Sequence, residues 1–462
     1  MPSAGGTTTS TAPAPAAPVA LPSFGEAVRV WARIGLLSFG GPAGQIATMH
    51  RELVEERGWI SETRFLHALN YCMLLPGPEA QQLATYVGWL LHRTLGGLVA
   101  GLLFILPGAV VMSALGLLYA VSHDVPLISA LFFGIKAAVL AVVVQALLRI
   151  GRRALSTRLH LAIAALAFVA IYAAQVPFPL VVLAAGLFGF AFAGKGFGAP
   201  AAPAAGEGIV DDLFAQGAMA HTRPSAGRAL KVLAVWLPAW LGPVALLALL
   251  TGPHSVWATI GSFFSVMAVV TFGGAYAALA YVAQAAVETF GWLSPHEMVD
   301  GLGLAETTPG PLILVLQFVG ILAAYRDPGA LPAWLAGLLG GVLTVWVTFA
   351  PCFLWIFLGA PYMEALRGNR RLAAAMSAIT AAVVGVILNL AVWFALHVVF
   401  REVREWRVLG LSPDVPVLAS VDWRAAVLTA GALVAMLRFR AGMMATLGVC
   451  ALVGLALSWL PA

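Results

Sequence analysis

The sequence predicts an all-α polytopic membrane protein made of two homologous helical halves. Of its 462 residues, 61% are hydrophobic and only 10% are charged, whereas a soluble domain carries about 25% charged residues. Apolar stretches long enough for membrane helices recur along most of the chain. A set of short motifs also recurs at a constant offset, which indicates an internal duplication.

The duplication rests on three motifs that keep their register without a gap. Each motif returns 233 positions later (272 − 39 = 233). The pairs are Phe39-Gly40-Gly41 with Phe272-Gly273-Gly274, Gly58-Trp59-Ile60-Ser61 with Gly291-Trp292-Leu293-Ser294, and Pro76-Gly77-Pro78 with Pro309-Gly310-Pro311. We expect the halves to be inverted repeats, as in many transporters, although the loop arginines give conflicting indications of orientation.

Each Pro-Gly-Pro motif interrupts a hydrophobic region and predicts a broken helix. Proline lacks a backbone donor and clashes with the preceding turn, so one helix ends there and another begins. A broken helix at membrane depth is tolerated only where it is buried in protein or lines a cavity. Broken helices at corresponding places in two halves indicate the binding site of a transporter. The alternative is that these residues only kink packed helices.

Composition divides the chain into four parts. Residues 1–23 lack an apolar core and predict a disordered cytoplasmic tail, not a cleaved signal. Residues 195–227 are rich in Gly, Ala and Pro and predict a linker. The linker separates a first transmembrane half, residues 24–194, from a second, residues 228–462. The cluster Arg149, Arg152, Arg153 and Arg158 predicts a cytoplasmic loop.

The hydropathy pattern predicts short helices around the breaks and longer helices elsewhere. The short ones are expected at 24–38, 62–75, 79–92, 275–290, 296–308 and 312–325. The longer ones are expected at about 95–121, 126–149, 159–175, 178–194, 229–251, 256–272, 331–358, 371–399, 423–437 and 442–460. Residues 43–57 look amphipathic and suit a membrane surface or a protein-lined vestibule.

Four strings resemble the chromate ion transporter family in its two-domain form. They are SFGGPAGQIATMHRELVEERGW, LLPGPEAQQLATYVG, VTFGGAYAALAYVAQ and GWLSPHEMVDGLGLAETTPGPLILVLQFVG. The resemblance covers residues 24–194 and 228–460. It implies a multi-pass carrier of the bacterial inner membrane that exports the chromate dianion, is associated with chromate resistance and is linked to sulfate by shape and charge. One departure is Ala275, where the first half has Pro42, so the two Gly-Gly breaks need not play the same part.

An oxyanion inside a membrane needs positive potential and hydrogen-bond donors. The helices that start at 79 and 312 would point their N-termini at the interior, and such ends attract anions. Gly77 and Gly310 would let the backbone approach a ligand closely. Arg33 and Lys136 are the candidate cations, and their repeat partners, Val266 and Thr380, are uncharged. We therefore expect one asymmetric anion site, with the alternative that Arg33 extends to the membrane interface.

The predicted substrate-binding residues cluster at the breaks and in the neighbouring spans. The polar side chains among them would donate hydrogen bonds to the anion, and the alternative is hydrogen bonding between helices. The set is Arg33, Phe39, Gly40, Gly41, Pro76, Gly77, Pro78, Gln82, Thr85, Lys136, Phe272, Gly273, Gly274, Thr307, Thr308, Pro309, Gly310, Pro311 and Gln317.

Two acids beside the breaks suggest proton coupling. Glu79 follows the first Pro-Gly-Pro directly, and Glu306 precedes the second by three residues. A neutral acid would let the dianion bind, and an ionised acid would expel it. The alternative is a structural ion pair for each. We expect export to be driven by the proton motive force.

Other function classes find less support. The sequence contains no HExxH, no GxSxG and no ATP-binding Gly-Lys-Ser/Thr loop, which disfavours an intramembrane enzyme or a pump. A membrane assembly or sensor protein would usually carry soluble modules. The three cysteines lack metal-ligand spacing, so no metal or cofactor is expected. The expected partners are a chromate- or sulfate-type dianion, protons and the lipid bilayer, without nucleic acid. The sequence is compatible with a homodimer, and it does not distinguish chromate from sulfate as the substrate.

Overall fold

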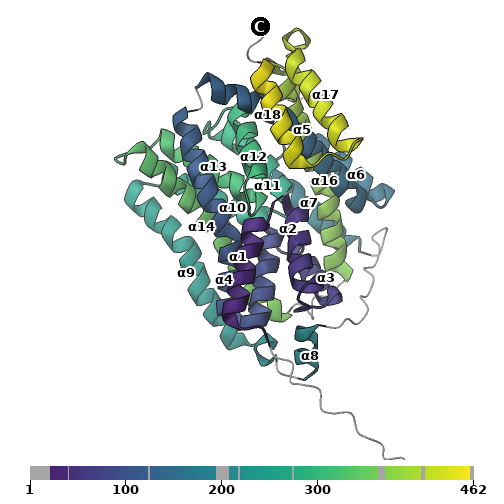
Figure 1. The fold of residues 1–462 in the computed structure, drawn as a ribbon, viewed down its shortest axis with the longest axis vertical. Coiled ribbons are helices and arrows are strands. Elements are labelled where there is room, and N and C mark those ends of the chain that lie inside the picture. Colours follow the sequence, from purple (N-terminus) through teal and green to yellow (C-terminus); the bar gives the residue numbers. More distant parts are fainter. Residues whose placement is uncertain are drawn as a thin grey trace, which may run out of the picture.

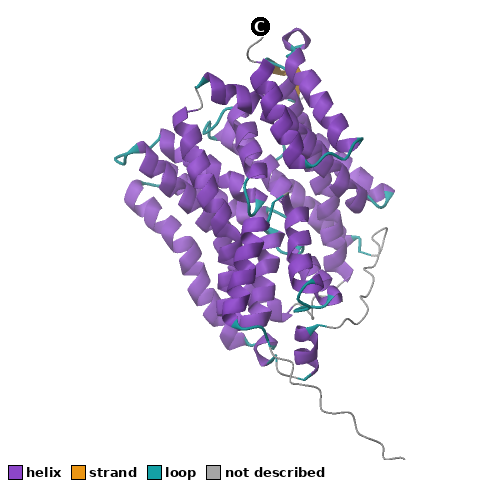
Figure 2. Cartoon of the chain, in the orientation of Figure 1, coloured by secondary structure: helices purple, strands orange, loops and turns teal. Residues whose placement is uncertain are grey.

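The computed structural model describes residues 21–39, 41–122, 125–193, 208–216, 219–272, 275–362, 370–406 and 412–457. Figure 2 shows that these residues are almost entirely helical. The prediction of an all-α chain missed one element, a short antiparallel pair of strands, β1 (Val403–Glu405) and β2 (Asp414–Pro416). The 3-10 helix η6 (Leu418–Ser420) follows this pair.

The helices of the first half follow the predicted order. They are α1 (Phe24–Leu37), α2 (Gly41–His50), the π-helix η1 (Arg51–Glu55), α3 (Glu62–Cys72), α4 (Glu79–Ser122), α5 (Pro126–Ala154), α6 (Arg158–Tyr172) and α7 (Phe178–Ala191). Ser23 and Ser61 cap α1 and α3 by accepting backbone N–H bonds. These caps explain why the two helices begin where they do.

The second half repeats this order after an additional helix. Its helices are α9 (Ala226–Thr251), α10 (Val256–Val270), α11 (Ala275–Gln284), the π-helix η3 (Ala285–Thr289), α12 (Pro295–Thr307), η4 (Leu312–Leu314), α13 (Val315–Arg326), α14 (Ala333–Gly359), η5 (Ala360–Tyr362), α16 (Arg370–Val399), α17 (Trp423–Leu437) and α18 (Met443–Leu457). The additional helix, α9, lies along the outer left edge of the molecule in Figure 1 and is largely uncovered.

Five of the described helices are long and apolar enough to cross a membrane by length and composition. They are α4, α5, α9, α14 with η5, and α16. The outward faces of the helices carry many exposed leucine, valine and phenylalanine side chains. A helix that is apolar on its inner and its outer face is typical of a membrane span. The chain is a multi-pass membrane protein.

Glycines bring helices of one half into close contact. α4 bends at His92 and Arg93, where the backbone is not helical, so its first part, 79–91, folds back on its second. A Cβ built on Gly88 would lie 2.5 Å from the Gly96 carbonyl oxygen. α13 packs on α14 in the same way, with Gly320 beside Gly340. Only glycine permits this approach of two backbones.

The two halves exchange their terminal hairpins. α6 and α7 of the first half pack on α16 of the second, and α17 and α18 of the second pack on α5 of the first, as Figure 1 shows for α18 and α5. A glycine allows close packing at each of these interfaces: Gly189 of α7 lies against Ala374 of α16, and Gly134 of α5 lies against Cys450 of α18. The core is therefore shared between the halves.

Part of the predicted linker, residues 195–227, is helical. Residues 194–207 lie outside the described residues, but α8 (Ile209–Ala215) and η2 (Ala220–Thr222) are helical. α8 packs on the first half: Val210 is fully buried, and Asp211 pairs with the Arg64 side chain at 2.7 Å. The segment contains buried apolar residues despite its flexible composition, and these hold it in place.

Candidate functional site

The Pro-Gly-Pro turn of each half is held by the Gly-Gly break of the other. The Gly77 N–H donates to the Thr271 carbonyl at 2.9 Å. The Gly310 N–H donates to the Ser38 carbonyl at 2.8 Å. Because both members of one bond are 233 positions from those of the other, the two bonds are repeat equivalents. Gly77 (φ +106) and Gly310 (φ +84) adopt a backbone conformation that disfavours any L side chain.

A cavity of about 310 Å³ opens beside the first Pro-Gly-Pro turn. We call it the arginine cavity. Its wall combines both halves, because Gly77 and Glu79 come from the first turn and Tyr276 comes from α11. The full lining is Pro42, Ile46, Leu69, Cys72, Met73, Leu75, Gly77, Glu79, Ala146, Arg149, Ile150, Arg153, Ala154, Ala275, Tyr276 and Thr380.

Two arginines supply the positive charge of the arginine cavity. Arg149 and Arg153 stand one turn apart in the last turns of α5, so their side chains leave the same face of the helix. Neither has a carboxylate within ion-pair distance among the described residues. Two guanidinium groups that make no ion pair with the protein can bind an oxyanion through charge-assisted, bidentate hydrogen bonds.

A buried acid stands behind the wall of the arginine cavity. The Tyr276 hydroxyl donates to Glu306 Oε1 at 2.8 Å. Glu306 is only 1% exposed, and its Oε2 atom has no hydrogen-bond partner. The cavity thus reaches a carboxyl group of the second break through one tyrosine. Such a group is suited to gain and lose a proton in step with the charge in the cavity.

Of the predicted site residues, Gly77 and Glu79 line the arginine cavity. Glu79 makes no ion pair in the described part of the chain. Gly41 lies close by, with a built Cβ 3.8 Å from the Tyr276 hydroxyl. Phe39 is 39% exposed. Gly40, Gly273 and Gly274 lie outside the described residues, whereas Phe272 is half-buried just before them.

The other predicted polar residues form hydrogen bonds within the protein. The Gln82 amide donates to the Pro76 carbonyl at 2.7 Å, and Thr85 accepts from Gln81 at 2.9 Å. Gln317 donates to the Ala109 carbonyl and the Ser113 hydroxyl, which joins α13 to α4. Thr307 and Thr308 donate to carbonyls of their own helix, those of Leu304 and Ala305. These contacts fit the alternative interpretation, hydrogen bonding within and between helices.

The second Pro-Gly-Pro turn, Pro309 to Pro311, is packed inside the protein. The Gly310 carbonyl accepts from the Gln45 amide at 2.7 Å. A Cβ built on Gly108 of α4 would lie 2.2 Å from the Pro309 carbonyl oxygen. Pro76 and Pro78, by contrast, flank the glycine that lines the cavity. The two breaks have equivalent backbones but different surroundings.

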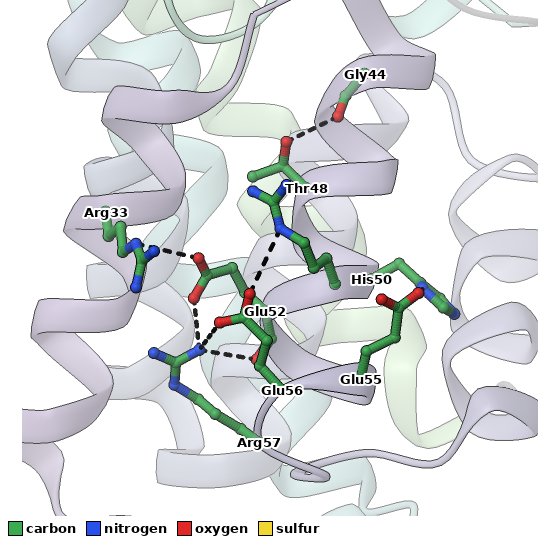
Figure 3. Close-up of polar contacts among 9 residues, drawn as sticks. Arg33, Gly44, Thr48, His50, Glu52, Glu55, Glu56 and Arg57 are labelled. Carbon is green, nitrogen blue, oxygen red and sulfur yellow. Dashed lines mark hydrogen bonds and ion pairs between the residues drawn. The ribbon is translucent and has the colours of Figure 1, made fainter.

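The two cations expected to share one anion site each make an ion pair with an acid of the protein. Arg33 pairs with Glu52 at 3.2 Å, and Glu52 also binds Arg57 at 2.5 Å, as Figure 3 shows. Lys136 pairs with Asp300 at 3.3 Å. Neither cation lines the arginine cavity. Each forms an ion pair with a buried acid on a neighbouring segment, because a buried carboxylate requires a counter-ion.

Sequence reasoning missed Arg149, Arg153 and Tyr276 as site residues. The two arginines end a long apolar stretch, a position that is typical of a cytoplasmic loop. Their spacing of four residues was the available signal, because it places both charges on one face if the helix continues. Tyr276 had no comparable signal. No group of three or more His, Cys, Asp or Glu in the described chain could hold a metal ion.

A duplicated helical membrane protein with a cavity between its halves that contains two arginines has the features of a membrane transporter. The family model described as Chromate transporter matches residues 25–190 and 258–455. The chain belongs to the chromate transporter family, and it is therefore a transporter and not an enzyme.

Two curated relatives cover most of the chain. It is 34% identical to a chromate transport protein of Pseudomonas aeruginosa over 361 residues, 77% of each protein. It is 28% identical to a chromate transport protein of Cupriavidus metallidurans over 363 residues, 78% of this chain and 80% of that one. No solved structure matches the chain.

Proposed function

We propose that this chain is a secondary transporter that exports a tetrahedral dianion of the chromate type across the bacterial inner membrane. The family and the names of the relatives support this class of substrate. Sulfate has the same shape and charge, so it is the expected competitor. The protein would use the proton motive force.

The pair Arg149 and Arg153 carries this proposal. Both arginines line the arginine cavity beside the start of α4, and neither makes an ion pair in the described chain. The helix N-terminus adds free N–H groups and about half a positive charge. Two cations and one helix end suit a dianion better than a neutral solute. Asymmetry supports a single site, because the repeat partner of Gly77, Gly310, is packed against α4.

Glu306 is the stronger of the two candidates for proton coupling. It is buried, and Tyr276 connects it to the wall of the arginine cavity. When Glu306 is neutral, the cavity holds a net positive charge and binds the dianion. When Glu306 is ionised, its charge opposes the dianion across a short distance and favours release. Glu79 is the second candidate, since it lines the same cavity.

An inverted arrangement of the halves would provide two related openings for this carrier. The exchanged Gly77 and Gly310 bonds support a two-fold relation between the halves. In Figure 1, α3 lies in the lower part of the molecule and its repeat partner α12 in the upper part. Opposite placement of repeat partners fits an axis in the membrane plane. The helices broken at Pro-Gly-Pro would then meet near the centre of the path.

Uptake of labelled chromate into everted vesicles tests the proposal. We expect accumulation that depends on an imposed proton gradient and that falls when unlabelled sulfate is added. Arg149→Gln removes one charge-assisted interaction, worth about 1.5–3 kcal/mol. This corresponds to a half-saturating concentration about 10- to 150-fold higher.

Arg152→Gln is the matched control for the variant at Arg149. Arg152 lies in the same turns of α5 but is not among the residues that line the arginine cavity. The control should keep the wild-type half-saturating concentration. Equal effects of both substitutions would reject the arginine cavity as the anion site, and accumulation equal to that of empty vesicles would reject transport itself.

A further inference from the structure

A second cavity is also lined by α5, but it lies nearer the beginning of this helix than the arginine cavity does. It has a volume of about 460 Å³, and its lining includes Tyr119, Lys136, His296 and Asp300. Lys136 precedes Arg149 by thirteen residues of α5, which is about 20 Å along the helix axis. The two cavities therefore open at different depths of one helix. We call the second one the lysine cavity.

The internal repeat relates the two cavities. Ile135-Lys136-Ala137-Ala138-Val139 of α5 corresponds to Ile379-Thr380-Ala381-Ala382-Val383 of α16. Thr380 lines the arginine cavity, and Lys136 lines the lysine cavity. The same position of the repeat thus faces a cavity in both halves. Such a pair is what a two-fold related protein would use as entrance and exit of one path.

An ion pair between the halves occupies the lysine cavity. Lys136 Nζ of α5 lies 3.3 Å from Asp300 Oδ2 of α12. The Tyr119 hydroxyl of α4 donates to the same oxygen at 2.8 Å. The Asp300 side chain is 4% exposed, and its Oδ1 atom has no partner. The carboxylate of Asp300 therefore connects α12 of the second half to α4 and α5 of the first, and only one of its two oxygens has a partner.

Close packing lies next to this ion pair. A Cβ built on Gly303 of α12 would lie 2.4 Å from Ile135 Cγ2 and 3.3 Å from Val139 Cγ2 of α5. Val139 is fully buried. No solute can pass between α5 and α12 unless the two helices separate here.

We infer that the lysine cavity is the second vestibule of the anion path and that the Lys136–Asp300 ion pair is a latch that holds α5 against α12, which closes the path beyond this cavity while the arginine cavity is open. The inference rests on the proposed transport function. Opening requires that Asp300 and Lys136 part, and the dianion itself is a replacement partner for the lysine. Breaking the pair without such a replacement is costly, because each charge is left buried and alone. The latch therefore favours opening when an anion is present.

Thiol labelling from the aqueous phase tests the latch. Val139→Cys reports on the closed contact, and Ile150→Cys reports on the arginine cavity that it lines. All three native cysteines are buried, but Cys72 also lines the arginine cavity and is therefore replaced by Ala. Labelling rates with a membrane-impermeant maleimide are measured on the full chain in detergent, with the Cys72→Ala chain as background.

The double variant Lys136→Gln/Asp300→Asn removes both charges and keeps similar volumes. We expect labelling at Val139→Cys to become about 10-fold faster and labelling at Ile150→Cys to become slower. Opposite changes mean that one vestibule opens as the other closes. Faster labelling at both positions would mean general loosening and would overturn the latch, as would unchanged rates at both.

The charge reversal Lys136→Asp/Asp300→Lys provides a second arm. A latch needs opposite charges on the two helices and not a particular order, so the reversed pair should label like the parent. Labelling of the reversed pair at the rate of the neutral pair contradicts the latch. Tyr119→Phe keeps the ion pair and should raise labelling at Val139→Cys only slightly. If the neutral pair fails to fold, the reversed pair and Tyr119→Phe still decide the question.

This experiment separates the latch from the proposed function. Labelling needs no substrate, so reciprocal labelling in a protein that does not accumulate chromate would preserve the latch and reject the substrate. Chromate uptake by a protein whose Val139→Cys labelling ignores the ion pair would preserve transport and reject the latch.

Discussion

Replacing Gly77 by alanine tests whether the first Pro-Gly-Pro turn is held by packing against α14. The φ angle of Gly77 is +106°, and a Cβ there would lie 2.8 Å from Cys352 Sγ and 3.2 Å from Gln82 Nε2. An L side chain in this backbone region costs about 1–2 kcal/mol. Overpacking against the Cys352 sulfur adds about 1–3 kcal/mol. We expect Gly77→Ala to destabilise the protein by more than the backbone cost alone, because the overpacking cost is added to it.

Gly58→Ala is the matched control for the backbone cost. Gly58 also has a positive φ, +58°, but a Cβ there would meet nothing within 4 Å. It should therefore cost only the backbone part, about 1–2 kcal/mol. Thermal unfolding of the detergent-solubilised protein, followed by tryptophan fluorescence, ranks the variants. Gly77→Ala should have the lower midpoint.

A double-mutant cycle isolates the clash. Cys352→Ala removes the sulfur that a Cβ on Gly77 would meet. In that background Gly77→Ala should cost only its backbone part, which gives a coupling energy of about 1–3 kcal/mol. Equal midpoints for Gly77→Ala and Gly58→Ala would refute the reasoning, and so would additive effects of Gly77→Ala and Cys352→Ala.

Three further predictions follow from single contacts. Glu52→Gln should lower the free energy of unfolding by about 1–3 kcal/mol, because the fully buried carboxylate binds two arginines. Arg33→Gln should lower it by less than about 1 kcal/mol, because that side chain is 54% exposed. Equal thermal midpoints for the two variants and the parent would contradict this prediction. Glu306→Gln should leave chromate uptake insensitive to an imposed pH gradient, and a preserved gradient dependence would exclude Glu306 as the coupling group. Gly101→Ala should destabilise by about 1–3 kcal/mol, because its Cβ would lie 2.4 Å from Thr85 Oγ1, and an unchanged midpoint would contradict this close contact.

The sequence by itself determined the helices and their order. Apolar runs predict membrane helices, and proline and glycine mark their ends, because both signals are local properties of the chain. The observed α5 (Pro126–Ala154), α10 (Val256–Val270) and α17 (Trp423–Leu437) begin within one residue of the expected positions. The repeat of the motifs also indicated a duplicated chain, with the charged residues shared unequally between its halves.

Only the tertiary structure decided which charges are neutralised and which face the cavity. Asp300, the partner of Lys136, lies in the other half, and Glu52, the partner of Arg33, lies in the π-helix η1 beyond the first Gly-Gly break. Arg149 and Arg153 resembled loop charges because they follow a long apolar run. Their role depends on where α5 ends relative to Tyr276 and Gly77. Ion pairing depends on distances across the fold, and a linear sequence does not contain those distances.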